Sequence, residues 1–245
     1  MESRVLIIVV KYIIMSYTGN IRKKRGIYMQ EYTKDRLYDI MDTTQCNQAN
    51  MLKRLDKKSK FGNFVMVYYS IALIVYALTA IYFPNYYDET LSGYFSIIIS
   101  VVILAFSIIN GNSKYSERIR ATESTLNAIK ALKRELTDSN IETKNAEYNK
   151  IIDTMEYRAE VDFFNTLKQR CKEYDIRWYR YKKDIKEKKS RVSKEQEEKL
   201  NKLNNYLSED YPFIQQLKII FDGVLCGVIV IMPILIFMSC FYIKM

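Results

Sequence analysis

FVMVYYSIALIVYALTAIYF, residues 64–83, is a stretch of twenty residues without a charged side chain. At a rise of about 1.5 Å per residue, a helix of this length is about 30 Å long, which matches the hydrocarbon thickness of a bilayer. A helix of similar length in a soluble core would need a polar face, and this stretch has almost none. We therefore expect residues 64–83 to cross a membrane.

A second apolar run, LSGYFSIIISVVILAFSIIN at residues 91–110, follows after a seven-residue link, so the two helices must be antiparallel. Acidic residues without a basic partner, Asp88 and Glu89, occupy the link. Basic residues flank the outer ends of the pair: Lys53, Arg54, Lys57, Lys58, Lys60, Lys114, Arg118 and Arg120. This asymmetry predicts a transmembrane hairpin at 64–110 with both ends in the cytoplasm.

A third apolar run occupies residues 219–243 and predicts a C-terminal transmembrane helix, in which a proline such as Pro233 is tolerated. Asp222 lies four residues after Lys218, so either an interfacial ion pair or a buried functional carboxylate fits this position.

Gly223 and Gly227 form a G-x-x-x-G pattern on the same run, which favours a close helix–helix contact. The pattern fits packing within the chain and self-association equally well.

The fold class predicted is therefore all-α, an integral membrane protein with a transmembrane hairpin, cytoplasmic helices and a third, C-terminal transmembrane helix. The start of the chain is ambiguous, because the apolar stretch at 5–15 is too short to span and is interrupted by Lys11. It is either an interfacial helix or lies before a true translation start at Met29. The expected segments are 1–28 (uncertain), 29–63 (cytoplasmic helix), 64–110 (hairpin), 111–175 (cytoplasmic helical core), 176–212 (basic helical arm) and 213–245 (third transmembrane helix).

The composition argues against an enzyme. The chain has no histidine, which removes the usual general base and the commonest zinc ligand. Its four cysteines are far apart in the sequence, and its seven glycines form no phosphate-binding loop. We expect no catalytic residue, no cofactor and no metal site.

The second transmembrane helix should continue into the cytoplasm from Tyr115, with Ser139 and Glu142 forming a capping box that opens the next helix. An apolar stripe at helical spacing supports the continuation: Tyr115, Ile119, Leu126, Ile129, Leu132 and Leu136.

The stretch YNKIIDTMEYRAEVDFF at residues 148–164 concentrates four carboxylates around one arginine. On a single helix, Asp153, Glu156 and Glu160 fall beside the apolar face, and Arg158 and Asp162 form an i, i+4 pair on its other edge. The carboxylates do not converge, so we interpret the stretch as structural. The apolar face of this helix comprises Tyr148, Ile151, Ile152, Met155, Ala159 and Phe163.

Two motifs, Y-S-E-R at 115–118 and Y-x3-I-x3-E-x-R-x3-D-F at 148–163, follow the hairpin in order. With this topology, the chain over about residues 29–167 resembles the SLATT domains, two-helix membrane effectors associated with bacterial nucleotide-signalling conflict systems. The family often has histidine at the position of Arg158. The residues that carry the resemblance are Tyr115, Arg118, Tyr148, Ile152, Glu156, Arg158, Asp162 and Phe163.

The resemblance implies an inner-membrane effector of anti-phage defence that forms homo-oligomers and depolarises the membrane when a separate sensor or nucleotide signal triggers it. A membrane scaffold that anchors a cytoplasmic partner and conducts nothing is the alternative. The polar members of the second motif, Tyr148, Glu156, Arg158 and Asp162, are expected to form a network.

Basic residues outnumber acidic ones over 177–202, where they follow Trp178 and Tyr179. We interpret this stretch as a solvated helical arm; contact with anionic lipid is the first alternative and nucleic-acid binding the last. Leu200, Leu203 and Leu207 keep a helical repeat that favours pairing with a neighbour.

Small and polar residues share one face of the second transmembrane helix, and two interpretations of this stripe remain open. It provides close helix packing, or it faces an aqueous path in an oligomer. The stripe comprises Gly93, Ser96, Ser100, Ser107 and Asn110. With no ring of charges within the spans, a leaky pore is the expected form of any channel.

Overall fold

The computed structural model describes residues 33–86, 88–189, 192–209 and 212–242, which form helices and no strand. The all-α prediction is thus confirmed. The expectations for residues 1–28 lie outside the described part of the chain. The helices are α2 (Lys34–Tyr82), α3 (Glu89–Asn112), α4 (Tyr115–Glu135), α5 (Ile141–Thr154), α6 (Glu160–Glu173), η1 (Trp178–Arg180), α7 (Tyr181–Lys189), α8 (Lys194–Glu209) and α9 (Pro212–Tyr242).

Three of the described helical stretches are long and apolar enough to cross a membrane, and they include α2, α3 and α9. Their apolar side chains are largely exposed, as expected for helices in contact with lipid. The three predicted transmembrane segments are therefore present in the fold.

The first transmembrane segment is the second half of a longer helix, because α2 runs without a break through the boundary expected at residue 63. Its first half, residues 34–60, carries many charged and polar side chains and is called the polar half of α2 below. At the junction, Asn110 of α3 donates a hydrogen bond to Asn63 (2.8 Å). The side chain of Asn110 also lies against Gly62, where a Cβ would meet its Oδ1 at 3.2 Å. A glycine at position 62 thus allows the two helices to approach where the apolar region begins.

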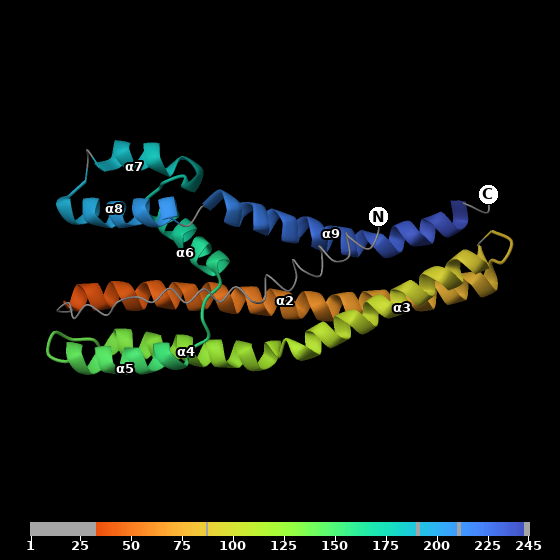
Figure 1. Cartoon of the computed structure of the whole chain (residues 1–245), viewed down its shortest axis with the longest axis horizontal. Coiled ribbons are helices and arrows are strands. Elements are labelled where there is room, and N and C mark those ends of the chain that lie inside the picture. The colour runs from red at the N-terminus through yellow and green to blue at the C-terminus, as the bar shows by residue number, and fades with distance from the viewer. Residues whose placement is uncertain (1–32, 87, 190–191, 210–211, 243–245) are drawn as a thin grey trace. The chain divides into compact units, whose positions relative to one another are not determined.

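Helix α9 packs beside the hairpin along its apolar length (Figure 1). At the far end, the backbone N–H of Asp88, in the hairpin link, donates to the carbonyl of Cys240 (3.1 Å). Because α9 reaches from the polar helices to this link, it crosses the membrane if the hairpin does. A shared apolar cluster holds the three helices together: Val65, Tyr69, Tyr76, Ile99 and Ile236.

Two tyrosines of α2 supply hydrogen bonds to the backbone of α9. Pro233 has no N–H, so the carbonyl of Ile229, four residues earlier, loses its helical donor. The hydroxyl of Tyr69 donates to this carbonyl (2.7 Å), and the hydroxyl of Tyr76 donates to the carbonyl of Pro233. Within lipid, where no water is available, the Tyr69 hydrogen bond replaces the helical bond that Pro233 cannot make.

The second transmembrane helix does not continue directly into the polar region as expected. Lys114 adopts a left-handed backbone conformation (φ 46°, ψ 40°) between α3 and α4. This conformation costs about 1–2 kcal/mol for a residue with a Cβ, and it turns the chain. The junction lets α3 diverge from the direction of α4.

Helices α4 and α5 pack on the polar half of α2, burying most of the stripe predicted from Tyr115 onward (Figure 1). The predicted capping box at Ser139 is wrong: α5 begins after Asn140, and the Ser139 hydroxyl lies 3.0 Å from that of Thr137. The buried apolar residues shared by α2, α4 and α5 are Leu37, Met41, Ile129, Leu132, Leu136 and Tyr148.

Helices α6, η1, α7 and α8 form a unit that we call the C-terminal module. The expected basic arm is not one helix, because α7 and α8 are separate helices that lie side by side, with α8 packed against α6 (Figure 1). Leu200, Leu203 and Leu207 are buried, so the helical repeat predicted to pair with a neighbour does so within the chain. Arg177 and Asp184 close the turn before α7 through two side-chain hydrogen bonds (3.0 and 2.9 Å).

We predict that Tyr69→Phe lowers the unfolding free energy of the protein by about 1–3 kcal/mol, because it leaves the Ile229 carbonyl without a donor. In a Pro233→Ala background the loss should be smaller, since residue 233 then supplies an N–H. Thermal unfolding in one detergent measures both changes. Tyr68→Phe is the matched control, and an equal loss in both backgrounds contradicts the assignment.

Candidate functional site

The polar half of α2 buries polar side chains on the face that meets α6. Asn47, Asn50 and Arg54 recur at i, i+3 and i+7, so they share one helical face. Asp162, Thr166 and Arg170 recur at steps of four on α6. Two polar stripes at helical spacing thus face each other. The residue spacing contained this signal, but Asn47, Asn50, Arg54, Thr166 and Arg170 were not among the residues predicted for a site.

Arg54 forms a bidentate salt bridge with Asp162: its Nε and Nη2 donate to Oδ1 and Oδ2 at 2.8 and 2.9 Å. The Asp162 side chain is completely buried, whereas that of Arg54 is 23% exposed. A buried carboxylate requires such a partner, because its desolvation would otherwise be very costly.

Arg118, in the first turn of α4, holds Glu156 in the same manner. Its Nε donates to one carboxylate oxygen (3.0 Å) and its Nη2 to the other. This pair is more exposed, at 30% and 37% of the two side chains. Glu156 lies between α5 and α6 and Asp162 in the first turn of α6, whereas the arginines come from the two helices that continue the hairpin. We call the two pairs the double clamp.

The segment that carries the two carboxylates is not helical throughout, so the single helix predicted over residues 148–164 is wrong. Helix α5 ends at Thr154, and both Met155 and Ala159 have extended backbones. Asp162 accepts a hydrogen bond from the backbone N–H of Ala159 (3.0 Å) and caps α6. The cap and the clamp together favour an interrupted helix over a continuous one.

The break changes the partners expected for the motif residues. The i, i+4 pairing of Arg158 with Asp162 needs a helix that spans both, but α6 begins only at Glu160; Asp162 is instead held by Arg54. The guanidinium of Arg158 lies over the ring of Phe163, 3.6 Å from its centroid. This is a cation–π contact.

Tyr148 belongs to a different contact. Its hydroxyl lies 2.8 Å from that of Thr44 and ties α5 to α2. Of the four residues predicted as a network, Tyr148 thus contacts Thr44, Glu156 contacts Arg118, Arg158 contacts Phe163 and Asp162 contacts Arg54.

A second ionic cluster lies one and a half turns before Asn47 on α2. Asp42 accepts hydrogen bonds from Lys133 of α4 (2.6 Å) and from Arg170 of α6. Burial alone would raise the pKa of Asp42, but the hydrogen bonds from Lys133 and Arg170 outweigh it and hold the pKa below its usual range. Asp42 thus joins α2 to both of its polar neighbours.

A family profile described as "SMODS and SLOG-associating 2TM effector domain family 5" (SLATT family 5) matches residues 29–242. The chain belongs to this family. Arg118 and Glu156, which lie in the two motifs that resembled SLATT domains, are direct partners in the fold. No curated protein and no solved structure matches the chain.

The SLATT match extends well beyond the end expected at residue 167 and includes α7, α8 and α9. The family description counts two transmembrane helices, whereas the described residues of this member include three helical stretches of transmembrane length. The C-terminal module and α9 are therefore parts of the matched domain.

The small-residue stripe of α3 faces mostly away from the rest of this SLATT chain. Gly93, Ser100 and Ser107 are exposed, and Ser96 is half-buried. At the polar end of the stripe, Asn110 contacts α2 through Asn63. Within the described part of the chain, Gly93, Ser100 and Ser107 of the stripe are therefore left largely uncovered. Ser100 donates to the carbonyl of Ser96 (2.8 Å), so its hydroxyl is already satisfied.

The G-x-x-x-G residues of α9, Gly223 and Gly227, are exposed, and a Cβ at either would meet nothing within 4 Å. Packing among the described residues does not use their small size. Asp222 is also exposed, and Lys218, predicted to pair with it, lies 3.6 Å from Glu160 of α6.

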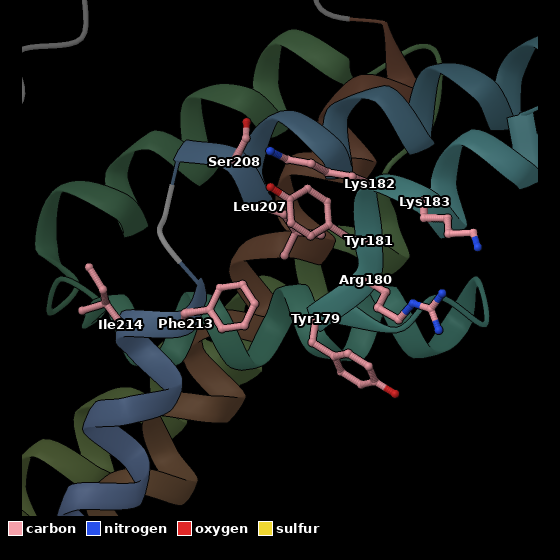
Figure 2. A pocket seen from close by; sticks show the side chains of 9 residues that line it. All are labelled: Tyr179, Arg180, Tyr181, Lys182, Lys183, Leu207, Ser208, Phe213 and Ile214. Atoms are coloured by element: carbon pink, nitrogen blue, oxygen red, sulfur yellow. The ribbon is translucent and has the colours of Figure 1, made fainter.

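A cavity of about 530 Å³ lies where α8 gives way to α9. Figure 2 shows the rings of Tyr181 and Phe213 on two sides of it, whereas Tyr179 and Lys183 point away. We assign it no ligand, because its cations lie at the rim. The lining residues are Tyr179, Arg180, Tyr181, Lys182, Lys183, Leu207, Ser208, Phe213 and Ile214.

We predict that Asp162→Asn lowers the unfolding free energy by about 3–5 kcal/mol, because it removes the charge that compensates Arg54 in a buried pair. Glu156→Gln, in the more exposed pair, should cost about 1 kcal/mol or less. Thermal unfolding of the two variants provides the comparison. Equal losses would show that the two halves of the clamp do not differ in burial energy.

We predict that the stabilising effect of Asp42 disappears in acid. Because its folded-state pKa is lowered, its contribution is present above the unfolded pKa of about 3.9 and is lost as the pH falls through the folded value. Asp42→Asn should therefore be less stable than the wild type at pH 7, and the difference should shrink as the pH falls below the unfolded pKa and through the lowered folded one. A difference independent of pH contradicts the assignment.

Proposed function

We propose that the protein is a membrane effector of a bacterial anti-phage defence system. Several copies assemble in the inner membrane and depolarise it when a separate sensor or nucleotide signal triggers them. The residues between the hairpin and α9 lie in the cytoplasm. The effector is not an enzyme and carries no cofactor; its partners are the lipid bilayer, further copies of itself and the triggering protein or signal, and not nucleic acid.

The observation that carries this proposal is the matched effector domain, in which three helices of transmembrane length continue into a charged helical region. Basic residues of α2 and α4 flank the polar end of the hairpin, and acidic residues occupy its link. This distribution supports a cytoplasmic location for the polar helices, because loops rich in lysine and arginine stay inside.

Exposed small residues on two helices support assembly. A Cβ at Gly93 of α3, or at Gly223 or Gly227 of α9, would meet nothing within 4 Å. Ser100 of α3 is exposed among the described residues. In lipid, such positions let helices of different copies approach closely and pack. A path between copies lined by serine hydroxyls and apolar side chains would leak without selecting an ion.

A non-conducting scaffold is the second candidate, and one observation favours it. Because the hydroxyl of Ser100 is satisfied by its own helix, the α3 stripe needs no water-filled path. In this case the polar helices would anchor a cytoplasmic partner.

We predict that induced expression of the wild-type protein together with its triggering partner depolarises cells, and that Ser100→Leu with Ser107→Leu abolishes the effect. Leucine fills the stripe and removes its hydroxyls. A potential-sensitive dye reports the change, with membrane-fraction immunoblots to confirm equal expression. Ser70→Leu is the matched control, since Ser70 is an exposed serine of α2 that also donates to its own helix (2.8 Å).

An unchanged membrane potential in the wild type, together with a partner that copurifies stably, would replace the pore by the scaffold. Depolarisation that persists in the double leucine variant would remove the α3 stripe from the mechanism.

A further inference from the structure

The C-terminal module meets α2 without a shared apolar core. Its own buried cluster draws only on α6, α7, α8 and the residues between them. The apolar clusters of the polar half of α2 draw only on α2, α4 and α5. Among the described residues, no apolar cluster joins α2 to α6. The module therefore has its core on one side of this interface, and α2 has its core on the other.

Polar contacts fill the interface instead. Thr166 of α6 donates to Asn47 (2.8 Å) and accepts from Asn50 (3.0 Å). Asn50 also donates to Gln169 (3.4 Å). Ion pairs lie at the two ends of this row, Arg54 with Asp162 and Arg170 with Asp42.

Such an interface separates more readily than an apolar one. Hydrogen bonds and ion pairs between protein groups are replaced by bonds to water when the surfaces part, so their net contribution is small. Apolar surfaces have no such replacement, and exposing them carries the full hydrophobic cost. A module with its own apolar core can therefore separate from α2 without unfolding.

The connection to α5 provides a pivot. Residues 155–159 are the only covalent link between α5 and α6, and they contain extended backbone rather than helix. Rotation in this link breaks no helical hydrogen bond of α5 or α6. The clamp on Glu156 by Arg118 fixes one end of the link to α4.

The module also holds the beginning of α9. Glu160 of α6 accepts a hydrogen bond from Gln215 (2.8 Å) and lies 3.6 Å from the Nζ of Lys218. Lys168 donates to Gln216 (3.3 Å). Movement of α6 would therefore be transmitted to the helix that forms the third span.

We propose that the C-terminal module is a releasable latch, which separates from α2 as a folded unit, pivots at residues 155–159 and moves the start of α9 relative to the hairpin. As a mechanism of regulation, this rests on the proposed function: the docked module corresponds to the resting effector, and release corresponds to the triggered one. The separation itself does not depend on conduction.

Two positions of α6 test the separation. Thr166 is 1% exposed and lies in the polar interface, whereas Cys171, also 1% exposed, lies in the apolar core of the module. Burial raises the pKa of the Cys171 thiol to about 11, so it is unreactive while the module is folded. A Thr166→Cys variant thus carries one reporter for docking and one for folding on the same helix.

The full-length variant is placed in lipid nanodiscs, where both faces are accessible, and labelled with a water-soluble maleimide. Peptide mass spectrometry then gives the labelling rate of each thiol. The charge contacts are weakened by Arg54→Gln with Arg170→Gln, by Arg170→Gln alone, and, with the native side chains, by raising the KCl concentration. Arg134→Gln, an exposed site on α4 outside the interface, is the matched control.

Release predicts that labelling at position 166 rises about tenfold or more in the double variant, less in the single variant and with salt, and not in the control. Labelling of Cys171 should stay unchanged throughout. Equal acceleration of both thiols means that the module unfolds rather than separates, and overturns the proposal. So does a rate at position 166 that none of the changes affects.

These outcomes are independent of the depolarisation assay. Selective labelling at position 166 in a protein that never depolarises cells upholds the latch and removes the pore. Depolarisation with no selective labelling does the opposite.

Discussion

The constraint on which the fold depends is that α2 is one helix in two environments. Its last twenty residues must present apolar side chains to lipid, whereas its polar half must contact polar side chains and water. Each half solves this differently. The apolar half gives tyrosine hydroxyls to the backbone of α9, and the polar half gives asparagine and arginine side chains to α6. Helices α3, α4, α5, α6 and α9 all pack against α2.

The double clamp explains why residues far apart in the sequence form one structural unit. Arg54 lies on α2 before the hairpin, and Arg118 lies on α4 after it. Each pairs with a carboxylate of the segment that follows α5. Removing that segment would remove the carboxylates that pair with these two guanidinium groups. The clamp therefore links the geometry of the hairpin to the fold of everything after residue 155.

Hydropathy was sufficient to predict the three apolar helices, because lipid leaves only one way to satisfy the backbone of a single chain segment. Periodicity also predicted the burial of Leu126, Ile129 and Leu132. It failed at residues 155–159, where the apolar spacing of a helix continues through a break. There, tertiary partners of Glu156 and Asp162 outweigh local preference.

The candidate site was predictable only in part for a related reason. The family resemblance directed attention to Glu156 and Asp162, but their partners Arg118 and Arg54 are 38 and 108 positions away. Charge alone does not indicate which of many arginines pairs with a given carboxylate. The polar stripe of Asn47, Asn50 and Arg54 was visible as spacing, yet a polar face is ordinarily assigned to solvent.

The two sides of the helical hairpin differ in whether the helix is continuous. Helix α2 is an unbroken rod of about 73 Å, from its capped start to the hairpin link. On the other side, the helix is interrupted between α3 and α4 at Lys114. A rotation or displacement of the polar helices would therefore be transmitted to the apolar half of α2. The break at Lys114 would reduce its transmission from α4 to α3. The two membrane-embedded rods would consequently slide or rotate against each other rather than move together.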